Sequence, residues 1–213
     1  MNQQEALAKG HEIPTDVKDP ELVAQRRRQI VDAAVGLFIA NGFHKTTTRQ
    51  IAKAAGFSIG NLYQYVKTKE DVLYLVCQAI HQEMENRLSQ RVRYAGNAAR
   101  ALSEAMENYF QVCDQMSDHI LLIYQETKSL TKESMLFVLA HEERITEVFA
   151  DLLRKGVADY TLKPLYAGQI ELMAHNIMVM GHMWTFRRWS LARHFTLEEY
   201  VEHQRDLIMS ELI

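Results

Sequence analysis

The sequence predicts an all-α protein. Only three prolines and nine glycines occur among its 213 residues, and the residues with high helix propensity, such as Ala, Leu, Glu and Gln, are abundant. Apolar residues recur at helical spacing, and no segment has the sustained alternation of apolar and polar residues that is typical of a half-buried strand. No internal repeat or low-complexity run occurs. A chain of this length can also bury a sizeable core.

The first helix is predicted from a start signal at Asp19 and Pro20. Residues 1–18 are polar without a lasting apolar period, so we expect them to form a flexible N-terminal arm. Asp19 suits the N-cap and Pro20 the first helical position. The helix should run to about residue 40, where Asn41 and Gly42 end it. Its expected inward residues are Leu22, Val23, Ile30, Ala34, Leu37 and Phe38.

Residues 48–67, TRQIAKAAGFSIGNLYQYVK, have the spacing of a helix, a three-residue turn and a second short helix. Thr47 with Gln50 forms a capping box, and Ile51 faces inward on the first helix. Gly56 stands where a sharp turn requires φ > 0, which Gly adopts without steric cost. Ser58 then caps the second helix. Ala55 shares a face with Ile51, the small Ala52 lets the second helix cross closely, and Phe57 and Leu62 fold back onto Ile51 and Ala55. This pattern predicts a helix-turn-helix that contacts DNA, within a head at residues 19–67.

The charge distribution agrees with that interpretation. Residues 22–69 contain eight basic side chains and one acidic one, a net charge of +7, whereas the whole chain carries −3 and its remainder therefore −10. A basic module on an acidic body concentrates the attraction for phosphate at one part of the molecule.

The remaining helices are predicted from caps and periodicity. Thr68 and Asp71 form a second capping box, which opens a linking helix at residues 68–95. Residues 96–213 should form an effector-binding and dimerisation body with helices near 97–116, 119–128, 132–155, 164–190 and 197–212. Asn97, Thr131 and Thr196 are the expected caps.

Residues 27–73, RRQIVDAAVGLFIANGFHKTTTRQIAKAAGFSIGNLYQYVKTKEDVL, resemble the TetR family of bacterial transcriptional repressors. Ile59, in place of a more usual polar residue, and Val66, in place of Phe, depart from the family pattern. The resemblance covers about the first third of the chain. It implies a three-helix DNA-binding head, a helical body with an inducer pocket, and a homodimer formed mainly by the last two long helices. It also implies that ligand binding swings the heads apart.

The second helix of a helix-turn-helix enters the major groove. The residues expected there are Ser58, Ile59, Gly60, Asn61 and Gln64. The side-chain amides of Asn61 and Gln64 suit adenine, and the methyl groups of Ile59 suit a thymine methyl. The residues expected at phosphates are Thr47, Thr48, Arg49, Tyr63, Tyr65, Lys67 and Lys69. Packing beneath the head is the alternative for Tyr63 and Tyr65. For Arg26, Arg27 and Arg28, a phosphate or minor-groove contact and a solvated first helical turn are both open. A two-fold dimer should bind a palindromic operator in double-stranded DNA.

The later helices are rich in Met and aromatic residues, which line adaptable apolar cavities or form a core or a dimer interface. The stretches at 121–130 and 184–209 resemble TetR members that accompany fatty-acid or acyl-CoA metabolism. A small hydrophobic effector, an acyl-CoA or another lipid-like ligand, is therefore our working hypothesis. An acyl-CoA also needs cations for its phosphates, and Arg187, Arg188 and Arg193 are candidates for that role. The candidate ligand-binding residues are Tyr109, Met116, Tyr124, Met173, Met180, Met183, Trp184, Arg187 and Arg188.

Other chemistry finds little support in the sequence. Cys77 and Cys113 are expected to be buried, reduced thiols, and His175 and His182 lack the close spacing of a chelating pair. No catalytic motif, metal site or cofactor is predicted. No run of about 18 apolar residues and no secretory signal is present, so we expect a cytoplasmic protein without a membrane association.

Three hypotheses follow. The first is a ligand-controlled repressor. The second is a DNA-binding dimer without a small-molecule effector, regulated through a protein partner. The third is a helical enzyme with a vestigial head. A large apolar cavity in the body favours the first hypothesis, a solidly packed body favours the second, and turnover of a hydrophobic substrate favours the third.

Overall fold

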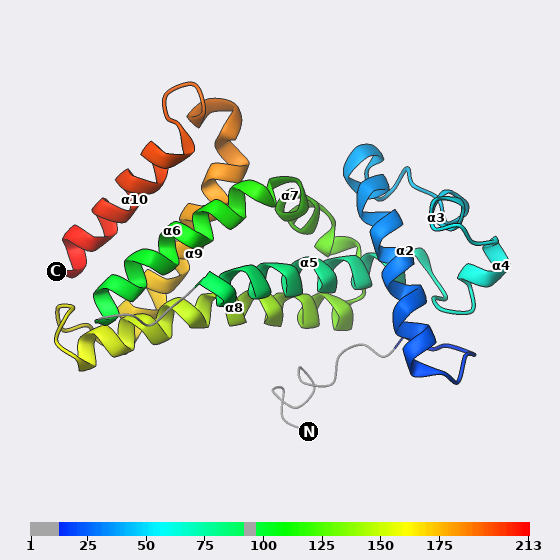
Figure 1. Cartoon of the computed structure of the whole chain (residues 1–213), viewed down its shortest axis with the longest axis horizontal. Helices are drawn as coiled ribbons and strands as arrows, with labels where there is room; N and C mark the ends of the chain where they lie inside the picture. The colour runs from blue at the N-terminus through cyan, green and yellow to red at the C-terminus, as the bar shows by residue number, and fades with distance from the viewer. Residues whose placement is uncertain (1–12, 92–96) are drawn as a thin grey trace. The chain divides into compact units, whose positions relative to one another are not determined.

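The computed structural model describes residues 13–91 and 97–213 (Figure 1), and every regular element within those two segments is helical. The predicted all-α class is therefore confirmed. The elements are α2 (Pro20–Asn41), α3 (Thr48–Ala54), α4 (Ile59–Leu62), α5 (Lys69–Arg91), α6 (Ala98–Gln115), α7 (Ser117–Glu126), the 3₁₀ helix η1 (Thr127–Ser129), α8 (Lys132–Ala158), α9 (Ala167–Leu191) and α10 (Leu197–Leu212).

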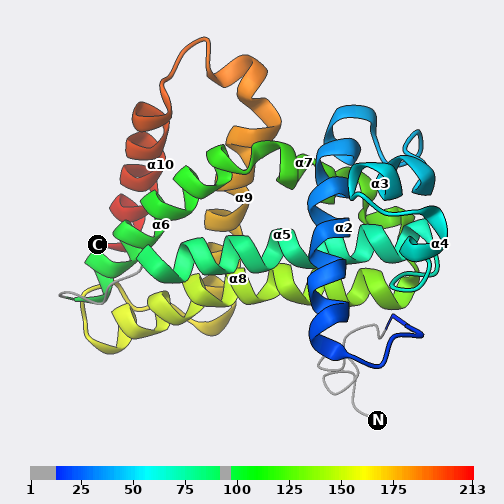
Figure 2. The ribbon, with the colours of Figure 1, turned by 45° about the vertical axis from the view of Figure 1, so that its right-hand side comes forward.

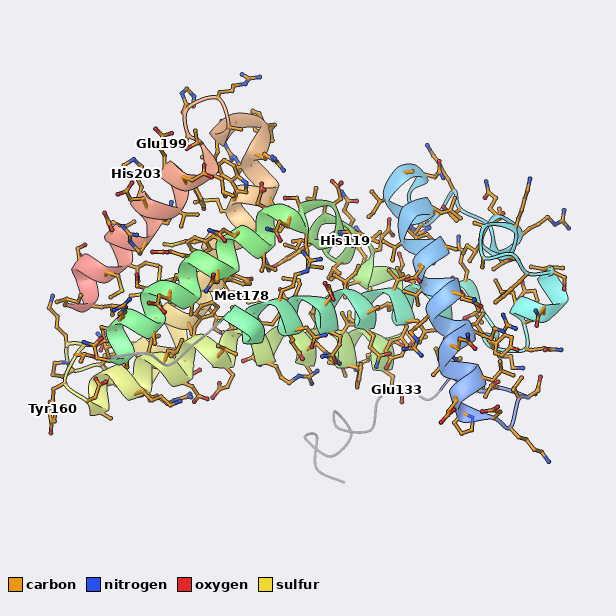
Figure 3. The ribbon with its side chains drawn as sticks, viewed as in Figure 1. His119, Glu133, Tyr160, Met178, Glu199 and His203 are labelled. Atoms are coloured by element: carbon orange, nitrogen blue, oxygen red, sulfur yellow. The ribbon has the colours of Figure 1, made fainter. Side chains whose placement is uncertain are left out.

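The predicted helix starts are confirmed by their hydrogen bonds. Asp19 Oδ1 accepts from the backbone N–H groups of Glu21 and Leu22 at 3.0 and 3.2 Å, which caps α2. Reciprocal capping boxes join Thr47 to Gln50, Thr68 to Asp71, and Thr196 to Glu199, which Figure 3 labels. Each box satisfies backbone donors that a helix start otherwise leaves without partners.

The chain forms two compact units. The first, which we call unit 1, contains the described residues up to Gln82 together with Leu121–His141, and unit 2 contains Glu83–Ile120 and Glu142–Ile213. The long helices α5 and α8 contribute residues to both units.

Unit 1 has a small core beneath α2, α3 and α4. Figures 1 and 2 show α3 and α4 on the same side of α2. From α2, Ile30, Ala34 and Phe38 are at most 1% exposed, and they share this core with Ile51 and Leu62. Leu22 and Leu37, which the sequence predicted to face inward, are only half-buried.

In the same unit, a tilted ring pair joins α5 to α8, and an edge-to-face pair extends it along α8. The Tyr74 and Phe137 rings are 5.5 Å apart, and those of Phe137 and His141 are 4.8 Å apart. Such pairs add specific geometry to simple apolar burial.

Unit 2 is built on α6, which packs against α9 and α10 (Figure 2). Gly181 permits the close approach of α9, because a Cβ at this position would lie 2.7 Å from the Tyr109 ring and 2.9 Å from Cys113 Sγ. The Tyr109 hydroxyl and His182 Nε2 form a buried hydrogen bond of 2.9 Å across the same contact. Met178, labelled in Figure 3, accepts a hydrogen bond from the Thr146 hydroxyl of α8.

Both thiols are buried and neither forms a disulfide, as predicted. Burial raises the pKa of Cys77 to about 12, with a further contribution from the Glu126 carboxylate. Burial also raises the pKa of Cys113 well above its ordinary value. None of the described helices combines the length and the apolar character needed to cross a bilayer.

Candidate nucleic-acid interface

The turn between α3 and α4 is closed by two backbone hydrogen bonds. Phe57 N–H donates to Ala52 O at 2.8 Å, and Gly56 N–H donates to Lys53 O at 3.2 Å. Gly56 has φ +74°, the left-handed conformation that this helix end requires. The local sequence therefore sets the angle at which the chain leaves α3.

The next helix, α4, is only four residues long and is held by its neighbours. Ser58 Oγ accepts the N–H of Asn61 at 3.1 Å, and Leu62 is completely buried. The chain then continues in tighter turns, with Tyr65 N–H donating to Leu62 O at 3.0 Å. A helix this short has little stability of its own, so its position depends on the cap and the buried leucine.

The residues predicted to contact bases lie on the solvent side of α4 and the following turn. Ser58, Gly60 and Gln64 are exposed, Ile59 is 37% exposed, and Asn61 is half-buried. The structure therefore brings all five together on one segment, where their polar groups can be reached from outside.

Most of the residues predicted to bind phosphate are also accessible. Thr47, Arg49 and Lys67 are exposed, and Tyr63 is 40% exposed. The half-buried Thr48 Oγ1 lies 3.2 Å from the Tyr63 hydroxyl, which joins the start of α3 to the end of α4. These side chains border the five residues above.

The structure uses Tyr65 and Lys69 differently from the prediction. Tyr65 is 5% exposed, with its ring centre 6.2 Å from that of Phe57, so the packed alternative holds for it. Lys69 Nζ donates to the carbonyls of Phe43 and Thr46 at 2.9 and 3.1 Å and lies 4.2 Å from the Phe43 ring centre. These contacts occupy the Lys69 ammonium group, and the Tyr65 ring is buried. Neither residue is therefore included in the candidate interface.

Arg27 has a supporting function that the sequence pattern did not indicate. Its Nε donates to Tyr65 O at 3.0 Å, and its Nη2 donates to Ile13 O at 2.7 Å. Residues 13–18 of the expected arm thus contact the helix-turn-helix part of unit 1, to which they belong, whereas residues 1–12 lie outside the described residues. No local spacing signals such a long-range contact. The buried Ile13, at 3% exposed, is an apolar residue in a polar stretch and was the one available hint.

The candidate ligand-binding residues are dispersed. Tyr109, Met116 and Trp184 are buried in unit 2, whereas Tyr124 is 46% exposed and belongs to unit 1. Met173, Met180 and Met183 are half-buried on α9, and Arg187 and Arg188 are exposed. The Tyr109 and Phe149 rings meet edge to face, with their centres 5.3 Å apart.

The polar ends of this group are already engaged within unit 2. Trp184 Nε1 donates to Asp114 Oδ1 at 2.8 Å, and Arg188 Nη1 lies 3.2 Å from the same oxygen. The Arg187 guanidinium lies 5.3 Å from the Trp189 ring centre. Of the two histidines considered for a metal, His175 is exposed and His182 is buried against Tyr109. Within the two described segments, no cluster of three or more His, Cys, Asp or Glu side chains is arranged to hold a metal ion.

The fold and the exposed α4 define a helix-turn-helix DNA-binding protein. Residues 30–74 match the family described as "Bacterial regulatory proteins, tetR family". The HTH-type transcriptional regulator HbdR of Aromatoleum sp. (strain CIB) is 30% identical over 196 residues, which cover 92% of this chain and 84% of that protein. The chain therefore belongs to the TetR family of bacterial transcriptional regulators.

Two further comparisons are informative. The HTH-type transcriptional repressor KstR2 of Mycolicibacterium smegmatis is 26% identical over 68% of this chain and 71% of that protein. The crystal structure of AibR in complex with isovaleryl coenzyme A and operator DNA matches with a TM-score of 0.71 and 18% identity, over 88% of this chain and 100% of that one. The latter similarity establishes the shared fold.

Proposed function

We propose that this protein is a cytoplasmic repressor that binds an inverted-repeat operator as a homodimer and is released from DNA by a small hydrophobic effector. The observation that carries the proposal is the presentation of α4. Its apolar Leu62 is buried while Ser58, Gly60 and Gln64 face solvent. We further propose that residues 19–67 act as the DNA-binding head, residues 68–95 as the linking helix, and residues 96–213 as the effector-binding and dimerisation body.

In this proposal, α4 enters the major groove and Asn61 and Gln64 pair with base edges. A good pairing of this kind discriminates by about 1–3 kcal/mol against the wrong base. Lys67, Arg49 and Tyr63 contact phosphates, which supply affinity without sequence information. Each neutralised phosphate contributes about −0.9 to the slope of log affinity against log salt.

The test uses the DNA upstream of the gene and a scrambled duplex of the same length. Asn61→Ala with Gln64→Ala should lower the preference for the natural sequence while leaving the affinity for the scrambled duplex nearly unchanged. Lys67→Gln, the matched control, should weaken both affinities by the same factor. An unchanged preference in the folded double variant would contradict the assignment of α4.

The homodimer is supported by exposed apolar side chains on the last two helices, α9 and α10. Leu172 and Val179 lie seven residues apart, two helical turns, on α9 and are 63% and 56% exposed, and Leu207 on α10 is 57% exposed. Protein interfaces commonly include exposed apolar side chains of this kind. A two-fold dimer in turn requires an operator with inverted half-sites.

Analytical ultracentrifugation tests this dimer. Leu172→Arg combined with Val179→Arg should shift the chain from dimer to monomer, because two cations would have to be desolvated at the interface. Tyr160→Arg is the control, since Tyr160 is 93% exposed but lies on the α8–α9 connection (Figure 3). Dimerisation that resists the double substitution would place the interface elsewhere.

A hydrophobic effector is supported by the half-buried methionines of α9 and by the exposed Arg187. An acyl-CoA thioester combines an acyl chain, which adaptable Met side chains suit, with phosphates, which an arginine suits. The bound isovaleryl coenzyme A of AibR, a protein with the same fold, makes this class the first to test.

One observation favours the second candidate, a DNA-binding dimer regulated through a protein partner. Gly181 lies so close to Tyr109 and Cys113 that α6 and α9 are in tight contact at Tyr109, one of the candidate ligand residues. A mobility shift on the upstream DNA with a panel of acyl-CoA thioesters and free acids separates the two candidates. Release by one class supports the first, and retention with every member supports the second.

A further inference from the structure

Residues 13–18 lie directly against the segment that follows α4. Thr15 Oγ1 donates to Gln64 O at 2.8 Å, so the incoming chain touches the backbone of a residue proposed to contact bases. Arg27 holds both segments, because its guanidinium donates to Ile13 O and to Tyr65 O. The buried Ile13 side chain adds an apolar anchor. This short stretch is therefore a fixed border of the candidate interface.

An ion pair closes this border. Lys67 Nζ lies 2.8 Å from Asp16 Oδ2, with the two side chains 38% and 78% exposed. Val17 N–H donates to Thr15 Oγ1 at 3.2 Å, which turns the chain at Asp16, and Lys67 N–H donates to Asp71 Oδ2 at 2.9 Å. Backbone contacts therefore hold both partners. Only the two side chains must therefore be ordered to form the pair, as in an ordinary surface ion pair.

The carboxylate of Asp16 pairs with the Lys67 ammonium group, which is the group that Lys67 would otherwise offer to a DNA phosphate. A phosphate oxygen and a carboxylate oxygen compete for the same ammonium donors, and an acid beside the lysine also repels the phosphate. We infer that Asp16 is an affinity-setting residue, an intramolecular competitor that weakens the contact between Lys67 and the DNA backbone. This inference rests on the proposed function only in that Lys67 faces the duplex.

The competition has a distinctive signature. A lysine whose charge is balanced by Asp16 releases little counterion on binding, whereas an unpaired lysine contributes a full phosphate contact. Removal of the acid should therefore steepen the salt dependence by about 0.9 per head. The effect should be the same on any sequence, because phosphates carry no base information.

The experiment measures the affinity of full-length Asp16→Asn for a random-sequence duplex and for the upstream DNA by fluorescence anisotropy, from roughly 50 to 200 mM salt. We expect both affinities to rise about threefold to fivefold per head, as for an exposed ion pair. Asp32→Asn is the matched control, since it removes the same charge from an exposed acid on α2 in the same unit. It should leave the salt slope unchanged.

A double-mutant cycle isolates the pair. Lys67→Gln should weaken binding, and in that background Asp16→Asn should no longer steepen the salt dependence, because no ammonium group remains to be freed. Equal effects of Asp16→Asn and Asp32→Asn, weaker binding by Asp16→Asn, or an Asp16→Asn effect on the salt slope that persists without Lys67 would each overturn the inference. Loss of all duplex binding by the unmodified chain would instead refute the proposed function.

Discussion

Replacement of Gly56 by alanine tests the turn that presents α4. A Cβ at this position would meet no atom within 4 Å, so the change adds no steric clash. The cost comes from φ +74°, which an L-residue adopts at about 1–2 kcal/mol. Alanine also restricts the unfolded chain, which offsets about 0.4–1 kcal/mol of this cost. The expected net loss is therefore about 1 kcal/mol.

Gly36→Ala is the matched control. Gly36 lies inside α2 and also has no atom within 4 Å of a built Cβ, but its backbone is helical. The same methyl group should therefore stabilise this position by about 0.5–1 kcal/mol. Opposite signs for one chemical change would isolate the backbone conformation of Gly56 as the cause.

Urea unfolding followed by far-UV circular dichroism provides the measurement. Both tryptophans, Trp184 and Trp189, lie on α9 in unit 2, so tryptophan fluorescence follows that unit whereas dichroism follows all helices. With urea m-values of about 1–3 kcal/mol/M, the midpoint for Gly56→Ala should fall by roughly 0.3–1 M. A Gly56→Ala protein that is as stable as the unmodified chain would refute the reasoning. Protein concentration must be held fixed, since the proposed dimerisation would contribute to stability.

Three further outcomes are expected. Gly181→Ala should destabilise unit 2 by about 1–3 kcal/mol in thermal melts, since its Cβ would overlap side chains of α6; an unchanged melting temperature would mean that α9 can shift. Lys69→Met should lower the stability of unit 1 by about 1–3 kcal/mol through lost bonds to backbone carbonyls, while Lys53→Met, at an exposed position, should have little effect. Burial raises the pKa values of Cys77 and Cys113 from 9.0 in the folded chain, so above pH 9 only the unfolded chain loses these protons. The free energy of unfolding should therefore be fully retained below pH 9 and should fall above it. A urea midpoint that does not fall between pH 9 and about 12 would contradict this.

The sequence predicted the features that depend on neighbouring residues. A cap such as Thr47 with Gln50 needs contacts only three residues apart, and Gly56 signals its own backbone conformation. The boundaries of the long helices differ by a few residues, as with α9, which begins at Ala167 instead of 164. Fraying and alternative starts make such ends the least determined part of a helix pattern.

The contacts that the sequence could not predict join distant residues. Lys69 was expected at a phosphate because it is basic and near α4, yet its ammonium binds carbonyls 23 and 26 residues earlier in the chain. Tyr65 has a polar tip suited to DNA but is buried at 5% exposure. Arg27 reaches Tyr65 O, 38 residues away. Composition and spacing describe which side chains are capable of a contact, whereas the fold decides which partner lies within reach.

The dependence of α4 on Ser58 and Leu62 bears on how this protein can evolve. These two anchors stabilise the short helix, while Ile59 and Gln64 project outward and contribute little to the core. Under the proposed function, substitutions at the outward positions should therefore retarget the protein to other promoters at almost no cost in folding. New regulatory circuits could arise from one gene duplication followed by a few codon changes in this segment, with the scaffold left intact.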